Sequence, residues 1–384
     1  MRSNLHLFFS FLLFLSLGVN ASWAQEKKFK RALVIGGLGI SPGVALGVIA
    51  GLKQKGWVPD VIITTCGSSL SAAIYNAFQD DKLALEYAKS SEYHQLLRQA
   101  KVETKSLLSL KKHFENNSDF LYMPNIFSNT ILHIPDEAPK YLPVSEFNDG
   151  PTGPRIIMVS ARSHFGPEAV GLPRTSPKAF TQVFFTDPDT ALAIGDYQSS
   201  VSKQFPRSLV EARTETRTDV STEVASRASV SDPFLTNPGK VGNDYYFTGA
   251  VDLFPLELAE SLADDVISNY PTGLYEGYGD VAIGVTFGYN QSELVYKKIQ
   301  NPRVKWVDLF GMDKHSFDPK PNLLIFLKNG IPKELKSFQK DMQKQWTLGY
   351  ERALEAIDAQ KAGSSITHLR NPIKRVSTGG KGGN

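Results

Sequence analysis

The residues around the only cysteine of the chain constrain its fold most strongly. Four β-favouring residues, Val61 to Thr64, precede Cys66, and small residues from Gly67 onward let a helix begin at once. A buried strand that turns sharply into a helix holds one side chain above the edge of a sheet, near the N–H groups of that helix. The pattern predicts a nucleophile elbow with Cys66 at its apex. The same residue also fits a second interpretation, because free cysteines commonly serve as small buried hydrophobic residues.

The first 24 residues have the pattern of a secretory signal peptide. Arg2 precedes an apolar run from Leu5 to Leu17, and Ser22-Trp23-Ala24 is a small-x-small cleavage pattern. The run is too short for a lasting membrane span. We therefore expect residues 1–24 to be removed and the protein to be periplasmic or secreted. In that oxidising setting, Cys66 is either shielded or reactive, since one cysteine cannot form an internal disulfide.

The rest of the chain has the composition of a folded protein with a large core. Hydrophobic residues make up 41% of its 384 residues, and a formal net charge of +3 gives no indication of nucleic-acid binding. We expect one domain over residues 25–358, with a helical and loop-rich insertion at about 79–150. Residues 359–384 are basic and glycine-rich, which predicts a disordered tail.

The N-terminal part of this domain alternates strands and helices. An apolar strand at 31–35 ends in the glycine-rich loop 36–43, and a helix at 44–55 leads to the elbow strand. The glycines do not have the G-x-G-x-x-G spacing, so no dinucleotide is expected. No Cys/His cluster has the spacing of metal ligands. We therefore expect neither a cofactor nor a metal.

The later segments continue the α/β pattern. Asp219 is expected to cap one of the helices, and an apolar stripe from Leu335 to Ile357 predicts that the last helix is amphipathic. The expected strands are 155–160, 180–186, 244–248 and 281–287, and the expected helices are 219–229, 256–262 and 333–358.

Three separated segments, in this order, resemble the patatin-like phospholipases. Residues 60–75 are similar to that family's D-x-I-x-G-T-S-A-G-A-L-x-A-A-L-Y elbow, and residues 220–234 to its A-x-x-A-S-x-x-x-P-x-x-F stretch. Residues 248–251 and 255–259 are similar to its D-G-A-x and P-V-x-x-A segments. The resemblance covers about residues 29–290. It implies a three-layer α/β/α patatin-like fold with a mainly parallel central sheet.

The resemblance also implies where the site lies and how it departs from the family. Cys66 replaces the nucleophilic serine, and Thr248 replaces the aspartate that activates it. Thr64 and Ser68 replace the two glycines that flank the nucleophile, and we expect them to crowd the turn. The backbone groups expected to bind an oxyanion are those of Gly37, Leu38, Gly39 and Gly67.

Two hypotheses follow from the loss of the serine and aspartate. The first, which the sequence favours, is a pseudoenzyme that binds a lipid, an acyl group or a protein partner, since threonine cannot accept a proton near neutral pH. The second is an active phospholipase or acyl-ester hydrolase with Cys66 as nucleophile and Asp252 as a displaced base. Under either hypothesis we expect a lipid or acyl-ester ligand and no nucleic acid. Peripheral contact with a membrane is compatible with both. A carboxylate within about 5 Å of the Cys66 sulfur would favour the second.

Overall fold

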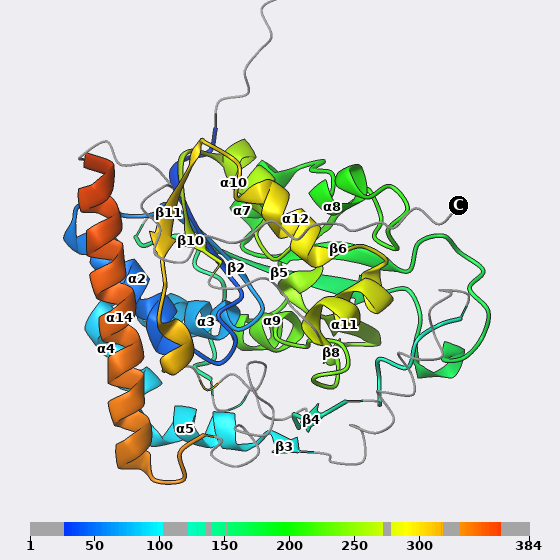
Figure 1. The fold of residues 1–384 in the computed structure, drawn as a ribbon, viewed down its shortest axis with the longest axis horizontal. Helices are drawn as coiled ribbons and strands as arrows, with labels where there is room; N and C mark the ends of the chain where they lie inside the picture. Colours follow the sequence, from blue (N-terminus) through cyan, green and yellow to red (C-terminus); the bar gives the residue numbers. More distant parts are fainter. Residues whose placement is uncertain are drawn as a thin grey trace, which may run out of the picture.

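A mixed sheet of nine strands forms the centre of the molecule (Figure 1). The computed structural model describes residues 27–102, 122–128, 130–135, 140, 142–150, 152–271, 278–315, 317 and 331–361. The strands are β1 (Phe29–Gly36), β2 (Val61–Thr65), β5 (Arg155–Ser163), β6 (Phe180–Phe185), β7 (Glu215–Arg217), β8 (Gly239–Val241), β9 (Asp244–Phe247), β10 (Ala263–Tyr270) and β11 (Val304–Asp308).

The sheet is mainly parallel, as the sequence predicts. Its order is β11-β10-β1-β2-β5-β6-β7, and the five strands from β11 to β5 are mutually parallel. Strand β6 runs antiparallel to β5, and the β8–β9 hairpin joins β5 through β9. Because parallel strands end at the same edge, the loops after β1 and β2 meet above the carboxyl ends of these strands.

Helices cover both faces of the sheet, which gives three layers (Figure 1). One face carries α2 (Pro42–Gln54), α3 (Ser68–Phe78), α4 (Asp81–Ala88), α5 (Ser91–Arg98), α9 (Thr222–Ser229) and α14 (Leu335–Lys361). The other carries α7 (Pro188–Ile194), α8 (Ser200–Gln204), α10 (Leu256–Leu262), α11 (Tyr278–Phe287) and α12 (Gln291–Lys298). The expected α/β/α arrangement is therefore confirmed.

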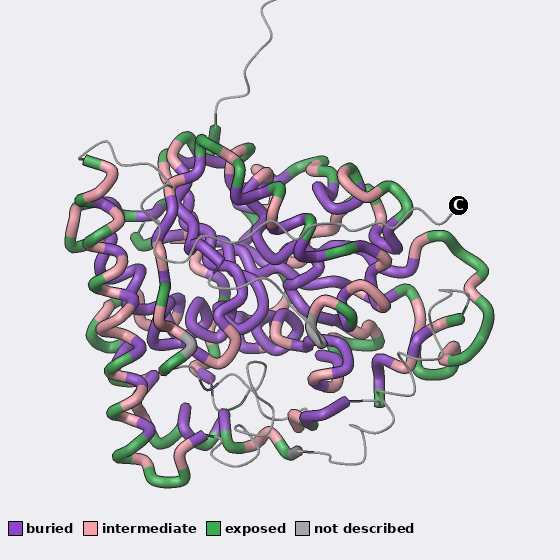
Figure 2. The backbone as a smooth tube through the Cα atoms, in the orientation of Figure 1, coloured by how far each residue is buried: buried purple, intermediate pink, exposed green. Residues whose placement is uncertain are grey.

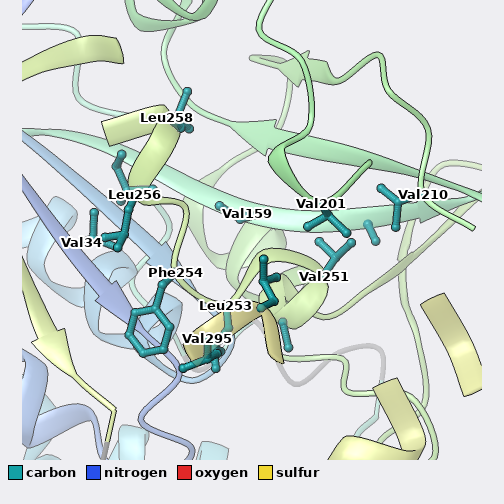
Figure 3. Packing of buried hydrophobic residues seen from close by; sticks show 14 of the residues in the cluster. Val34, Val159, Val201, Val210, Val251, Leu253, Phe254, Leu256, Leu258 and Val295 are labelled. Carbon is teal, nitrogen blue, oxygen red and sulfur yellow. The ribbon is translucent and has the colours of Figure 1, made fainter. Parts of the chain in front are cut away.

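The apolar strands supply two cores, one on each side of the sheet. In β1, Ala32 and Val34 belong to one cluster and Leu33 and Ile35 to the other, because successive side chains of a strand point to opposite faces. Figure 2 shows the sheet as an almost continuous buried region, and Figure 3 shows Val34 among the side chains of the cluster under α10. Burial on both faces explains why the strands are apolar throughout instead of alternating with polar residues.

The long C-terminal helix packs against α2 at very short range. A Cβ atom on Gly47 would lie 2.1 Å from the carbonyl oxygen of Trp346, and one on Gly349 would lie 2.1 Å from that of Val44. These glycines let the two backbones approach closely. The buried face of α14 is consequently Phe338, Met342, Gln345, Gly349, Ala353 and Ile357, which differs from the predicted stripe by including small and polar residues.

Two sequence predictions about these elements were wrong, and two strands were missed. Residues 281–287 were expected to be a strand but form most of α11, in which Ala282, Ile283, Thr286 and Phe287 are buried at helical spacing. The helix expected from Asp219 begins at Thr222, because the Asp219 carboxylate pairs instead with the guanidinium of Arg217 at 2.6 Å. Strands β10 and β11 were not predicted.

The expected terminal segments lie mostly outside the described residues. Residues 1–24 and 362–384 are among those that the structure does not describe, so the signal peptide and the basic tail remain predictions. Within the described ranges, none of the helices combines the length and the hydrophobicity that a membrane span needs.

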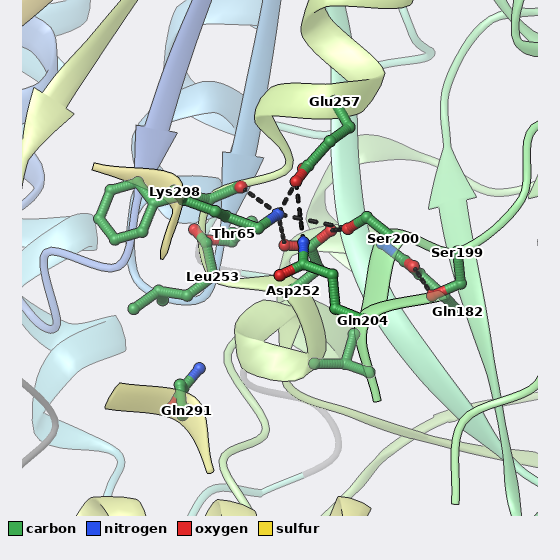
Figure 4. Close-up of polar contacts among 12 residues, drawn as sticks. Thr65, Gln182, Ser199, Ser200, Gln204, Asp252, Leu253, Glu257, Gln291 and Lys298 are labelled. Carbon is green, nitrogen blue, oxygen red and sulfur yellow. Dashed lines mark hydrogen bonds and ion pairs between the residues drawn. The ribbon is translucent and has the colours of Figure 1, made fainter. Parts of the chain in front are cut away.

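A buried ion cluster lies under α12 (Figure 4). The ammonium of Lys298 contacts the carboxylates of Asp252 and Glu257 at 2.6 Å each, and the Ser200 hydroxyl donates to the other oxygen of Asp252 at 2.8 Å. Burial would lower the pKa of Lys298, but the two carboxylates raise it above its usual value. Lys298 is therefore charged. Burial raises the pKa of Asp252 above its usual value, and the Lys298 ammonium opposes this shift by stabilising the carboxylate.

We predict that Lys298→Met will destabilise the fold by about 3–5 kcal/mol, because it leaves the Asp252 carboxylate buried without a counter-ion. The neighbouring Lys297→Met is the control, since Lys297 pairs with Glu293 on the surface and should change stability by less than about 1 kcal/mol. Urea unfolding monitored by circular dichroism would measure both. Equal effects of the two substitutions would contradict a stabilising role for the cluster.

Candidate active site around Cys66 and Asp232

Cys66 stands at the turn between β2 and α3, where the sequence placed it. Its φ is +57°, a left-handed conformation that residues other than glycine rarely adopt. Its backbone N–H donates to the Ser229 hydroxyl at 3.0 Å, and the Ser69 hydroxyl donates to the same oxygen at 2.9 Å. The contact with α9 thus helps to hold an unfavourable backbone conformation in place. This is the geometry of a nucleophile elbow.

Two glycines bring other backbone segments against the turn. A Cβ atom on Gly67 would lie 1.6 Å from the carbonyl oxygen of Gly39, and one on Gly249 would lie 2.7 Å from the backbone nitrogen of Cys66. No side chain fits at either position. The loop after β1, the elbow and the turn after β9 therefore meet at Cys66.

The side chains at the two replaced glycine positions tie the elbow together. The Thr64 hydroxyl lies 3.1 Å from that of Ser69, and the Ser68 hydroxyl donates to the carbonyl of Ile35 at 2.5 Å. Ser68 Oγ also accepts from the N–H of Thr65 at 3.2 Å. The side chains of Thr64 and Ser68, which were expected to crowd the turn, therefore form hydrogen bonds within the turn and to β1.

A carboxylate lies beside the thiol, and it belongs to Asp232. The Cys66 Sγ is 3.4 Å from Asp232 Oδ1 and 3.7 Å from Oδ2. Asp232 follows α9, so it reaches the elbow from an element other than the turn that carries the family's aspartate. The separation is within hydrogen-bond range for sulfur. Asp232 can therefore accept the proton of the Cys66 thiol.

Thr248 contacts the same carboxylate. Its hydroxyl donates to Asp232 Oδ1 and accepts from the N–H of Ala250 at 2.9 Å. Cys66, Asp232 and Thr248 are all buried. Thr248 thus reaches the carboxylate that contacts Cys66, and it does so as a hydrogen-bond donor.

The expected oxyanion donors divide into two groups. The N–H of Gly37 donates to the Thr65 carbonyl at 3.1 Å, so it already has a partner, and Leu38 packs its side chain in the core and is not among the residues that line the cavity. Gly39 and Gly67 line a cavity together with Cys66. Among the described residues, no backbone carbonyl accepts from the N–H of either glycine. These two groups are the best placed to stabilise an oxyanion.

The cavity has a volume of about 100 Å³ and is almost entirely apolar. Cys66 and Asp232 form one part of its wall. Part of the opposite wall comes from α5 and from β4 (Leu132–His133), which belong to the segment that the sequence marked as an insertion without a chemical motif. The apolar lining includes Ile40, Leu70, Leu97, Leu132, Leu142 and Leu235.

Asp252, the displaced base of the second hypothesis, lies in the buried ion cluster and is not among the residues that line the cavity. Its two carboxylate oxygens are bound by Lys298 and Ser200 in the cluster of Figure 4. Sequence reasoning did not select Asp232, although this residue stands inside the stretch that resembles the family. The only available signal was its position just after a helix that follows the elbow in the family pattern, and no spacing rule connects it to Cys66.

Comparison with known proteins adds little to this geometry. No family model matches the chain, and no curated protein matches it. Among solved structures, the crystal structure of VipD from Legionella pneumophila aligns over 86% of this chain and 67% of its own, with a TM-score of 0.34 and 11% sequence identity. A similarity this low does not indicate what the protein does. The functional assignment therefore rests on the site.

We predict that Gly67→Ala will destabilise the protein by about 3 kcal/mol, because the new methyl group would collide with the backbone oxygen of Gly39. Gly284→Ala is the control: it lies in helix α11 with 3.6 Å to its nearest neighbour and should be neutral or stabilising by up to about 1 kcal/mol. Thermal and urea unfolding of the two variants would test this. A Gly67→Ala protein as stable as wild type would show that the loop can move away from the elbow.

Proposed function

We propose that the protein is an acyl-ester hydrolase of patatin-like fold in which Cys66 is the nucleophile and Asp232 the general base. The observation that carries the proposal is the 3.4 Å contact between the Cys66 sulfur and the Asp232 carboxylate at the apex of an elbow. The pseudoenzyme hypothesis rested on the absence of a base. A carboxylate at hydrogen-bond distance from the thiol supplies one.

The acylation step follows from these positions. Asp232 takes the thiol proton while the sulfur attacks the ester carbonyl carbon, and the carbonyl oxygen becomes an oxyanion near the N–H groups of Gly39 and Gly67. When the intermediate collapses, the carbon–oxygen bond to the alcohol breaks. The protonated Asp232 then returns its proton to the leaving alkoxide, which leaves an acyl thioester on Cys66.

Deacylation uses the same base. Asp232 takes a proton from a water molecule, whose oxygen attacks the thioester carbonyl, and the sulfur leaves as a thiolate. The proton held by Asp232 returns to the sulfur, and the carboxylic acid product departs. One carboxylate is sufficient for both half-reactions, since it is protonated and deprotonated once in each.

The ligand class follows from the cavity. Its apolar wall suits an acyl chain, and the backbone N–H groups of the two glycines that line it suit a carbonyl oxygen. We infer that the substrate is an ester or lipid with an acyl chain, as expected from the sequence. Export by the N-terminal segment, and contact with a membrane or protein partner, are further parts of the proposal.

We predict that the wild-type protein will hydrolyse p-nitrophenyl butyrate, that Cys66→Ala will abolish the activity, and that Asp232→Asn will reduce it at least about 10²-fold. Asp244→Asn is the matched control, because Asp244 lies on β9 beside Arg217 and does not contact Cys66. The measurements are p-nitrophenol release and the mass of the trapped acyl enzyme. If wild type releases no more product than Cys66→Ala, the pseudoenzyme hypothesis stands instead.

We also predict that Thr248→Val will lower kcat by about tenfold or more without a matching change in KM, because it removes a hydrogen bond to a charged carboxylate. Thr248→Ser keeps the hydroxyl and should retain most of the activity. Steady-state kinetics of both variants would measure the difference. Similar losses in the two would indicate that Thr248 contributes through packing of its methyl group and not through its donor.

A further inference from the structure

The cavity beside Cys66 is small for a substrate pocket, and its size limits what the site can hold. Its volume is about 100 Å³. An apolar cavity of about 150 Å³ is known to hold benzene, which has six carbons. By that measure the space next to the thiol accommodates an acyl chain of roughly four to six carbons. The long chains of ordinary membrane lipids do not fit in it.

The wall facing the elbow comes from a separate part of the chain. Leu97 of α5, Ala100 and Leu132 of β4 all line the cavity, and Leu97 and Leu132 are buried. Figure 1 shows α5 and the β3–β4 pair (Lys101–Val102 and Leu132–His133) in a layer beyond the ends of α3 and α9. These side chains line the same cavity as Cys66, so an acyl chain carried by the sulfur would contact them.

This wall is anchored, so it does not simply move away from a longer chain. The Nε2 atom of His94 on α5 lies 2.6 Å from the carbonyl oxygen of Pro332, and its ring stacks on Phe338 of α14 at 4.7 Å between centroids. Helix α14 is in turn packed closely on α2. The position of Leu97 is therefore fixed through α5 by the C-terminal helix.

From these observations we propose that the site selects short acyl chains, and that Leu97, Ala100 and Leu132 set the upper limit on chain length. This inference rests on the proposed function, because it assigns the cavity to the acyl group of the ester that Cys66 attacks. Each methylene that enters an apolar pocket contributes about fourfold in binding. Activity should therefore rise with chain length until the wall is reached and then fall.

The test is the hydrolysis of p-nitrophenyl esters from acetate to dodecanoate. Wild type should have its highest kcat/KM at about four to six carbons. Leu97→Ala and Leu132→Ala each remove three carbons from the wall and should move the optimum about two carbons higher. Ala100→Leu should move it lower. Leu85→Ala is the matched control, because Leu85 is a buried leucine of the neighbouring α4 that does not line the cavity; it should leave the optimum unchanged.

A binding experiment separates this inference from the proposed function. Methyl ketones of four to twelve carbons, tested on the Cys66→Ala protein by saturation-transfer NMR, probe the cavity without any reaction. If no ester is hydrolysed but only the short ketones bind, the hydrolase proposal fails and the chain-length limit stands. If esters are hydrolysed equally well at four and twelve carbons, or if all three wall variants keep the wild-type profile, the chain-length inference is overturned and the hydrolase proposal remains.

Discussion

The left-handed conformation of Cys66 is the constraint on which the rest of the site depends. A β-carbon at φ +57° is strained, so the surrounding structure must stabilise this backbone. It does so with a serine from α9, a glycine from the turn after β9 and a glycine-rich loop after β1. The elements that hold the elbow are the same ones that bring Asp232 to the sulfur, Thr248 to Asp232 and Gly39 to the cavity beside Cys66. The contacts that stabilise the strained backbone of Cys66 therefore also assemble the site.

The local part of this arrangement could be predicted from the sequence, because it is encoded over a few residues. The run from Val61 to Gly67 specifies strand, turn and helix by itself, and residues 256–262 form the helix that their pattern indicates. The predictions failed where tertiary packing, and not local propensity, determines the secondary structure. Val281, Ile283 and Val285 have high strand propensity, yet packing of Ala282 and Phe287 against the sheet favours a helix there. In β10, Asp264 and Asp265 lie inside the strand and interrupt its apolar pattern.

The sequence also could not predict which carboxylate lies beside Cys66, because tertiary packing determines it. Asp232 is 166 residues from Cys66 in sequence, and its position depends on how the chain leaves α9. Asp252 lies only four residues from Thr248 in sequence, but its carboxylate pairs with the buried Lys298 of α12. Two buried aspartates thus have opposite roles, decided by whether their neighbour is an ammonium or a thiol. Sequence proximity gives no information about that choice.

The packing of α14 on α2 has a consequence for the order of folding. The N–H of Gly43, at the start of α2, donates to the side chain of Gln345, which is 302 residues later in the chain. The loop that carries Gly39 leads directly into this helix start. During synthesis from the N-terminus, the elbow and its nearby strands emerge first, but the loop opposite the sulfur gains its final support only when α14 has left the ribosome. The nascent chain therefore carries an incomplete site until α14 has been synthesised.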